Sequence, residues 1–435
     1  MRPLREATQI LHRVVTDGGP RGAVYGTRLA SSDEDDVGTA DMSTATYPVW
    51  DMGLRGEAHG MWARMREHDP VHLTIGPVSG NRIWLVTRYA DCEALFRHPG
   101  VGKQPEKAGL SVAEVMGDEL LARSMIQLDP PDHTRLRRLV NKAFTPRIVA
   151  RLEPRIRELV DGMLDEAARR GTADLIADLA FPLPVTVIAE LLGVPASDRD
   201  RFRAWTRAAL TGDPAAAAEA HAAFTAYLDE LIERRRAQPR GDLLSALVVA
   251  EDEGERLDHA ELLGMVFLLL IAGHETTVNL IGNGVLALTE HPAAWAELIA
   301  DPSVAPAVVE EVLRYDGPVE VAPVRFAYED IEVAGATIPR GALIGLVLLS
   351  ANRDPARHDD PDVFDIHRRG PHLAFGHGIH FCLGAPLARL EGAVAFQQLA
   401  RRFPGMRLAT ERGAMRWLDG LLMRGVTELP VQLGP

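Results

Sequence analysis

The chain has 435 residues, 46% of them apolar, which is enough to build a large core. Its net charge of -14 argues against nucleic acid as the main partner, because phosphates are bound by positively charged surfaces. Two cysteines, Cys92 and Cys382, exclude a disulfide framework. The longest uncharged apolar run, Leu262 to Gly273, is shorter than the roughly 20 residues that cross a bilayer, so we expect a cytoplasmic protein without a membrane segment.

Residues 1–41 differ in composition from the rest of the chain. They contain Gly18-Gly19-Pro20 and the acidic run 31–36, and they show little periodicity, so we expect a disordered N-terminal extension. Met42 could equally be the natural start of the protein. No linker or repeat divides the remainder, which predicts a single domain over residues 42–435.

The first half of this domain is expected to alternate short strands with helices. A strand is predicted at 81–87, then a helix at 89–96 in which Cys92 is a buried apolar residue, and a short helix at 113–123. A helix opens near His133, after a turn with two prolines, and residues 152–250 are mostly helical.

Residues 133–152 carry six basic side chains and no acid, although the protein as a whole is acidic. His133 and Arg137 are four positions apart on one helical face, where they could bind an anionic group together. The other basic residues form either a solvated surface or a docking patch for an acidic partner: Arg135, Arg138, Lys142, Arg147 and Arg151.

A long apolar helix is predicted from Asp258 to about Glu290, and it should run through the core. Its middle holds Ala272-Gly273-His274-Glu275-Thr276-Thr277, residue types that are unfavourable in a buried helix. Two interpretations follow. Either the helix opens there and exposes polar groups to a ligand, or a threonine hydroxyl bonds to a carbonyl one turn earlier.

The last third mixes helices with short strands. Helices are predicted at 307–315, where Glu311 and Arg314 can pair, and at 386–402; strands are predicted within 328–339 and around 415–431. The apolar stretch 341–350 is either a buried helix or a strand. The predicted fold class is therefore mainly α with small β-sheets.

The most distinctive stretch of the chain is 375–384, Phe-Gly-His-Gly-Ile-His-Phe-Cys-Leu-Gly. Glycines such as Gly376 let the backbone turn sharply and approach a flat partner closely. Cys382 lies just before a predicted helix N-terminus, which favours the thiolate over the thiol. Because no second cysteine is near, zinc or an iron–sulfur cluster is disfavoured, whereas haem iron needs only one protein ligand.

With these motifs in this order, the chain resembles the cytochrome P-450 family from about residue 45 to its C-terminus. The family's haem-loop pattern Phe-Gly-x-Gly-x-His-x-Cys-x-Gly is matched at every fixed position from Phe375 and Gly376 to Gly384. The resemblance implies the cytochrome P-450 fold, in which a large helical region and a smaller β-rich region enclose haem b (iron protoporphyrin IX).

The resemblance also implies a role for each matching residue. Cys382 would be the axial ligand of the iron. Glu275 and Thr276 would conduct protons to dioxygen, and Ala272 and Gly273 would leave room for it. The propionates would be bound by His133, Arg137, Arg325 and His380. Glu311 and Arg314 would form a structural ion pair with a third partner, either Arg368 or Arg369.

The function that the resemblance implies is a monooxygenase that hydroxylates or epoxidises a small organic molecule. The similar proteins are soluble actinobacterial enzymes of secondary metabolism, such as those that tailor macrolides. Electrons would come from NAD(P)H through a reductase and a ferredoxin, and the substrate pocket would draw on 99–120, 200–225 and 319–324. Two alternatives are a non-catalytic haem-binding or recruitment protein on the same fold and an enzyme that uses Cys382 as a nucleophile.

Overall fold

The computed structural model describes residues 47–76, 80–111, 123–198, 201, 204–205, 214–252 and 255–434. The expected extension at 1–41 lies outside the described residues, and so does the expected helix at 113–123 apart from Arg123. The expectations of disorder and of a start at Met42 therefore stay predictions.

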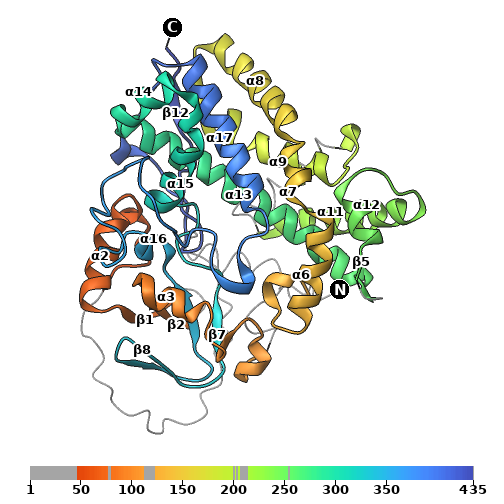
Figure 1. Cartoon of the computed structure of the whole chain (residues 1–435), viewed down its shortest axis with the longest axis vertical. Coiled ribbons are helices and arrows are strands. Elements are labelled where there is room, and N and C mark those ends of the chain that lie inside the picture. The colour runs from red at the N-terminus through yellow and green to blue at the C-terminus, as the bar shows by residue number, and fades with distance from the viewer. Residues whose placement is uncertain are drawn as a thin grey trace.

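The molecule has a large helical part and a smaller part built on a β-sheet, as the resemblance implies. Figure 1 shows α8, α9, α11, α13 and α17 in the upper part and the strands β1, β2, β7 and β8 below them. The longer helices are α2 (Ala58–His68), α6 (Asp132–Ala143), α8 (Glu153–Arg170), α9 (Pro182–Leu191), α11 (Pro214–Ala237), α13 (His259–Glu290), α14 (Pro292–Ala300), α15 (Ala305–Asp316) and α17 (Ala385–Arg402). Short helices are α3 (Tyr89–Leu95), α7 (Pro146–Ala150), α12 (Leu243–Val249) and α16 (Leu348–Ala351).

Four small sheets accompany the helices in the described part of the chain. The largest has the order β1-β2-β10-β7-β3, in which β10 is parallel to β2 and the other pairs are antiparallel. Its strands are β1 (Val71–Ile75), β2 (Arg82–Val86), β10 (Leu343–Leu346), β7 (Arg325–Ala327) and β3 (Val101–Gly102). The others pair β11 (Arg407–Leu408), β12 (Pro430–Gln432) and β4 (Thr172–Asp174); β5 (Glu251–Asp252) and β6 (Glu255–Arg256); and β8 (Ile331–Val333) and β9 (Ala336–Ile338).

Most sequence-based expectations for these elements are confirmed. The predicted strand at 81–87 is β2, the helix at 89–96 is α3 with Cys92 fully buried, and the long helix is α13. The stretch 341–350 is neither wholly strand nor wholly helix, because β10 is followed at once by α16. Around 415–431 the strand structure is limited to β12 and isolated bridges such as Trp417 with Val426.

Helix α13 is the centre of the helical part. Asp258 and Glu261 form a capping box at its start, and the helix is continuous over its 32 residues. By length and composition it could cross a membrane, but it is largely buried among the neighbouring helices, which identifies it as a core helix. It packs against α9, α15 and α17.

Two glycines bring α13 and α17 into close contact. A Cβ atom on Gly284 of α13 would lie 2.1 Å from the Phe396 ring of α17. A Cβ atom on Gly392 of α17 would lie 3.3 Å from Leu280 of α13. The two helices therefore approach too closely for larger residues at these points, and this fixes α17 on α13.

The ion pair predicted between Glu311 and Arg314 is buried rather than on the surface. Both side chains are 3% exposed, and Arg314 donates to both carboxylate oxygens of Glu311. Arg368 lies 3.7 Å from the same carboxylate and donates to the backbone carbonyls of Asp359 and Asp360, whereas Arg369 is exposed. Arg368 is therefore placed as the third partner.

Candidate functional site

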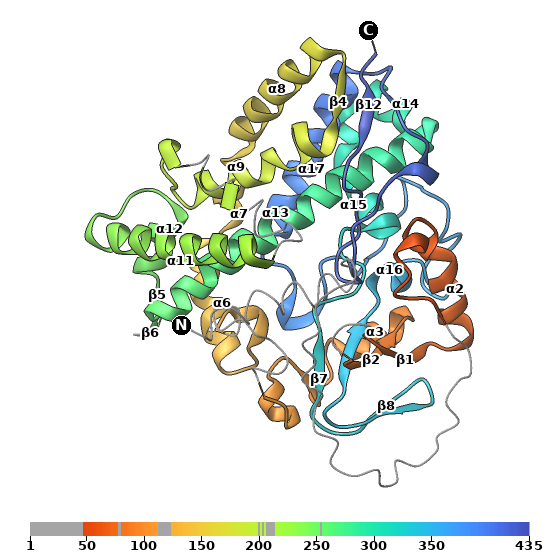
Figure 2. The same cartoon turned by 180° about the vertical axis from the view of Figure 1, so that it is seen from behind.

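The cysteine loop lies between the two parts of the molecule. In both views it lies below α13, between α6 and β7 (Figures 1 and 2). Gly376 and Gly378 each have a φ of 71°, in the left-handed region that favours glycine, and the Cys382 N–H donates to the Phe375 carbonyl at 2.9 Å. The loop is thus closed on itself just before α17 begins at Ala385.

The environment of Cys382 acts on the pKa of its thiol in two opposite directions. The backbone N–H groups of Gly384 and Ala385 and the charges of Arg137 and Arg389 do lower the pKa of the thiol, as the helix N-terminus predicts. Burial acts in the opposite direction and is larger, so the pKa of Cys382 is raised overall. The helix end thus favours the thiolate, as expected, but burial outweighs its effect in the protein alone.

Four of the predicted site residues converge beside this loop. His133 on α6 and His380 in the loop have ring centroids 4.3 Å apart. Arg325, at the start of β7, is 5% exposed, and its guanidinium lies 4.4 Å from the Phe96 ring centroid. Arg137, one turn after His133, donates to the Phe381 carbonyl at 2.9 Å. Helix, strand and loop thus bring these four basic side chains together.

Sequence reasoning missed Lys103, which belongs to the same cluster. Its side chain is buried, and its ammonium donates to the Pro323 and Val324 carbonyls, both at 2.8 Å. The charge of Lys103 contributes to the lowered pKa of His380. The charge of Arg325 in turn contributes to the lowered pKa of Lys103. The available signal was composition, because Lys103 is one of only three lysines in the whole chain.

The basic cluster has less negative charge than positive charge. Burial is the largest cause of a lowered pKa in all five members: His133, Lys103, Arg137, Arg325 (to about 10) and His380 (to about 2). Asp129 is the carboxylate that opposes this shift at His133, Lys103 and Arg325. It accepts from the Lys103 N–H and from the Tyr328 hydroxyl, and Lys107 approaches it to 3.5 Å.

This imbalance fits a ligand with two carboxylates. In their charged forms Lys103, Arg137 and Arg325 outnumber Asp129 by two. Both ring nitrogens of His133 and the Nε2 atom of His380 are buried without a hydrogen-bond partner, which is rare for polar groups that are not reserved for a ligand. The two propionates of a haem would supply the missing charge and the missing acceptors. The residues present therefore fit haem, although the described residues offer no group of three or more His, Cys, Asp or Glu side chains that could hold a metal ion.

The polar middle of α13 decides between the two interpretations left open by the sequence. Thr276 donates from Oγ1 to the Ala272 carbonyl at 2.8 Å, and Thr277 to the Gly273 carbonyl at 3.4 Å, while the helix continues unbroken. The threonines therefore bond back to the preceding turn, as the second interpretation holds, and the helix does not open as the first interpretation requires. Loss of water raises the pKa of Glu275 to about 7.

The basic side chains that follow His133 are less accessible to a docking partner than the sequence indicates. Arg135 forms an ion pair with Glu261, a member of the capping box of α13, and is only 20% exposed. Arg138 lies 3.6 Å from Glu255, and both of these side chains are exposed. Lys142 is exposed too. Arg135 thus has a structural role, and a docking surface is left to the more exposed members.

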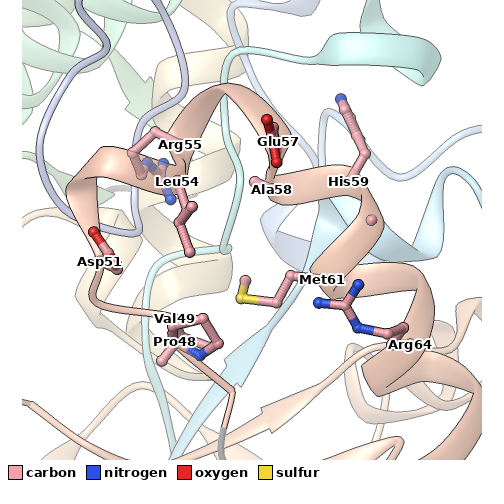
Figure 3. A pocket seen from close by; sticks show the side chains of 11 residues that line it. Pro48, Val49, Asp51, Leu54, Arg55, Glu57, Ala58, His59, Met61 and Arg64 are labelled. Atoms are coloured by element: carbon pink, nitrogen blue, oxygen red, sulfur yellow. The ribbon is translucent and has the colours of Figure 1, made fainter.

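A separate hollow of about 360 Å³ lies at the N-terminal side of the described chain. It is bounded by Pro48 and Val49, by the turn that carries Leu54, and by Met61 and Arg64 of α2 (Figure 3). It contains none of the predicted site residues. We therefore place the candidate site at the cysteine loop and not at this hollow.

Comparison with known proteins shows which family the chain resembles. The family model described as "Cytochrome P450" matches residues 185–405. The chain is 46% identical to cytochrome P450 107B1 of Saccharopolyspora erythraea, over 90% of this chain and all of that protein. It is 46% identical to the cytochrome P450 monooxygenase PikC of Streptomyces venezuelae, over 91% of this chain and 96% of PikC. The solved structure of the polyketide synthase cytochrome P450 PksS of Bacillus subtilis matches with a TM-score of 0.83 at 39% identity, covering 88% of this chain and 98% of that one.

The excess of positive charge in the basic cluster predicts that Lys103 contributes to haem binding. We expect Lys103→Met to raise the dissociation constant for haem by about tenfold or more, because a hydrogen bond with a charged group contributes roughly 1.5–3 kcal/mol. An absorbance titration of the apoprotein with haem measures the change. Lys107→Met is the matched control, since Lys107 is 48% exposed at the rim of the cluster. Equal effects of the two substitutions would contradict the assignment.

Proposed function

The chain belongs to the cytochrome P450 family and is a haem-binding monooxygenase, and we propose that it hydroxylates or epoxidises an apolar molecule of secondary metabolism. The observation that carries the proposal is the basic cluster behind the cysteine loop, in which every pKa is lowered and an anionic cofactor is needed to restore the charge balance. We assign haem b as that cofactor.

The ligands of the haem are assigned from the residues that meet at the loop. The Cys382 sulfur would bind the iron from the N-terminal side of α17, with Phe375 and Gly376 shaping the backbone beneath it. His133, Arg137, Arg325 and His380 would bind the propionates, because charge-assisted hydrogen bonds favour these residue types. Bound haem supplies the iron centre at which dioxygen is reduced and one oxygen atom is transferred to the substrate.

Proton delivery is assigned to Glu275 and Thr276, with Ala272 and Gly273 leaving space beside them. A pKa of about 7 lets the Glu275 carboxyl both hold and release a proton near neutral pH, as a proton relay requires. The Thr276 hydroxyl has a single proton, which it donates to the Ala272 carbonyl at 2.8 Å. To donate toward dioxygen it must exchange that bond, so rotation of Thr276 is part of the proposed relay.

The substrate is proposed to be a mostly apolar molecule of the kind that macrolide-tailoring enzymes accept. Support comes from relatives that include, besides PikC, the mycinamicin IV hydroxylase/epoxidase of Micromonospora griseorubida, which is 41% identical over 86% of this chain. The segments expected to line the pocket, 99–120 and 200–225, lie partly outside the described residues. Of the third, 319–324, Val321 and Ala322 are buried.

Electrons are proposed to come from NAD(P)H through a reductase and an acidic ferredoxin in the cytoplasm. The docking surface that we assign combines two exposed apolar side chains of the cysteine loop, Ile379 (49% exposed) and Phe381 (41%), with Arg138 and Lys142 on α6. Arg137 connects α6 to the cysteine loop through its hydrogen bond to the Phe381 carbonyl. An apolar centre with a charged rim is typical of protein interfaces.

The two alternatives are less well supported. A non-catalytic haem-binding protein has no use for an acid and an alcohol in the middle of a buried helix, where Glu275 and Thr276 lie. A cysteine nucleophile needs a nearby base, and burial together with the surrounding positive charges lowers the pKa of His380 to about 2, which makes it a poor one.

Replacing the proposed iron ligand tests the cofactor assignment. We expect Cys382→Ala to abolish the carbon-monoxide difference spectrum typical of thiolate-ligated ferrous haem, because no sulfur would then reach the iron. Cys92→Ala is the matched control, since Cys92 is fully buried against β2 and donates to the Val86 carbonyl. An unchanged spectrum in Cys382→Ala would refute the assignment.

Removing the proposed proton donor tests the relay. We expect Thr276→Ala to raise the hydrogen peroxide released per NAD(P)H consumed several-fold, because protons would reach dioxygen less efficiently. Thr289→Ala serves as the control: this threonine, in the last turn of α13, also bonds a carbonyl of its own helix. Wild-type coupling in Thr276→Ala would show that Thr276 is not part of the relay.

Charge reversal tests the docking surface. Arg138→Glu combined with Lys142→Glu should raise the KM for ferredoxin by roughly tenfold at low salt and leave peroxide-driven turnover unchanged, because only partner binding would be affected. The matched control reverses two exposed arginines elsewhere, Arg169 on α8 and Arg416 near the C-terminus. If both double variants behave alike, this surface is not the docking site.

A further inference from the structure

The cysteine loop begins with an aromatic ring that lies against a charged side chain of the next helix. The Arg389 guanidinium, on α17, is 4.5 Å from the centroid of the Phe375 ring. The Phe375 carbonyl accepts the Cys382 N–H at 2.9 Å, so the residue in contact with this guanidinium is hydrogen-bonded to the proposed iron ligand. Because a cation is attracted to the face of an aromatic ring, the contact favours one orientation of Phe375.

Glu310 on α15 holds this guanidinium in place. The Nε atom of Arg389 donates to Oε1 of Glu310 at 2.6 Å, and Nη2 donates to Oε2 at 2.9 Å. Two such bonds fix the plane of the guanidinium as well as its position. The two helices pack closely at this point, since a Cβ atom on Gly392 of α17 would lie 3.2 Å from Val309 of α15. The geometry of the pair is therefore set by the helix contact.

His372 is a second donor to Glu310, and its own hydrogen bonds show that it is neutral. Its side chain is 7% exposed, and its Nε2 atom lies 3.3 Å from Oε2 of Glu310. Its Nδ1 atom accepts the Ala374 N–H at 3.2 Å, which requires a lone pair on Nδ1 and places the proton on Nε2. Against the effect of burial, the hydrogen bonds from His372 and Arg389 lower the pKa of Glu310 to about 2, so this carboxylate is charged at neutral pH.

We propose that Glu310 and Arg389 form a charge-balanced pair that holds the Phe375 ring of the cysteine loop and sets the reduction potential of the haem bound at Cys382. Reduction adds one electron to the haem and its sulfur ligand, and a positive charge nearby favours the reduced form. The intact pair has one charge of each sign. Loss of either member leaves a single charge beside the loop, so the two losses should shift the potential in opposite directions.

The neighbouring acid does not replace Glu310 in this pair. Glu311 forms its own buried ion pair with Arg314 and is approached by Arg368 to 3.7 Å. Glu310 and Arg389 are more accessible, at 43% and 38% exposed. Water and salt therefore screen their charges, and the effect of losing one member should become smaller as ionic strength rises.

A redox titration of the purified haem-loaded enzyme, followed by absorbance, measures the potential. Arg389→Met should shift it to more negative values, because the Glu310 charge is then unbalanced. Glu310→Gln, whose amide oxygen can still accept from Arg389, should shift it to more positive values. The double variant should return close to the wild-type potential, because no net charge remains. Both single shifts should shrink in high salt, and Arg389→Lys, which keeps the charge, should stay near wild type.

A matched control comes from the other end of α17. Arg402, in the last turn of the helix, forms an ion pair with Asp165 of α8. Arg402→Met and Asp165→Asn remove the same kinds of charge farther from the cysteine loop, and they should leave the potential unchanged. Equal shifts in these variants and in Arg389→Met and Glu310→Gln would contradict the assignment.

The double variant separates an electrostatic role from a merely structural one. If the pair only braced the loop, Arg389→Met and Glu310→Gln would shift the potential in the same direction, and the double variant would lie at least as far from wild type. That result, or unchanged potentials in both single variants, would overturn the proposal. Arg389→Gln replaces Arg389→Met if the latter does not fold. The proposal rests on haem ligation by Cys382, whose failure would appear separately as an unchanged carbon-monoxide spectrum in Cys382→Ala.

Discussion

The protein places basic side chains where water cannot reach them and provides too little negative charge to balance them. Burial lowers the pKa of Lys103, Arg325 and His380, and the Asp129 carboxylate compensates only in part. A protein alone gains nothing from such a cluster, because each buried charge loses its hydration. The cluster becomes favourable when an anion enters it, so binding of the cofactor and stability of this region are coupled.

The helices beside the cluster pack closely because of two small residues. Gly284 and Gly392 let α13 and α17 pack without the separation that side chains would impose. The cysteine loop leads directly into α17, and the polar turn lies in the middle of α13, so this contact also fixes the loop relative to the turn. The proposed site, in which one helix follows Cys382 and another carries Glu275 and Thr276, depends on such a contact.

The parts of the site that are encoded locally could be predicted from the sequence. The loop around Cys382 is one continuous motif, and the ends of α13 follow from a capping residue and from periodicity. Lys103 was missed because its function depends on carbonyls more than two hundred residues away. The pairing of Arg135 with Glu261 was missed for the same reason, and so a charge run was interpreted as a free surface when part of it is structural.

Burial shifts the pKa of Cys382, Glu275 and Glu391 in the same direction, and the groups differ in the neighbours that oppose this shift. The Cys382 thiol has backbone N–H groups and arginines nearby, which oppose the effect of burial on its pKa without overcoming it. Burial raises the pKa of the Glu275 carboxyl to about 7 and that of the Glu391 carboxyl to about 8. Burial thus leaves the Glu275 carboxyl close to the midpoint of its titration at neutral pH and the Glu391 carboxyl mostly protonated.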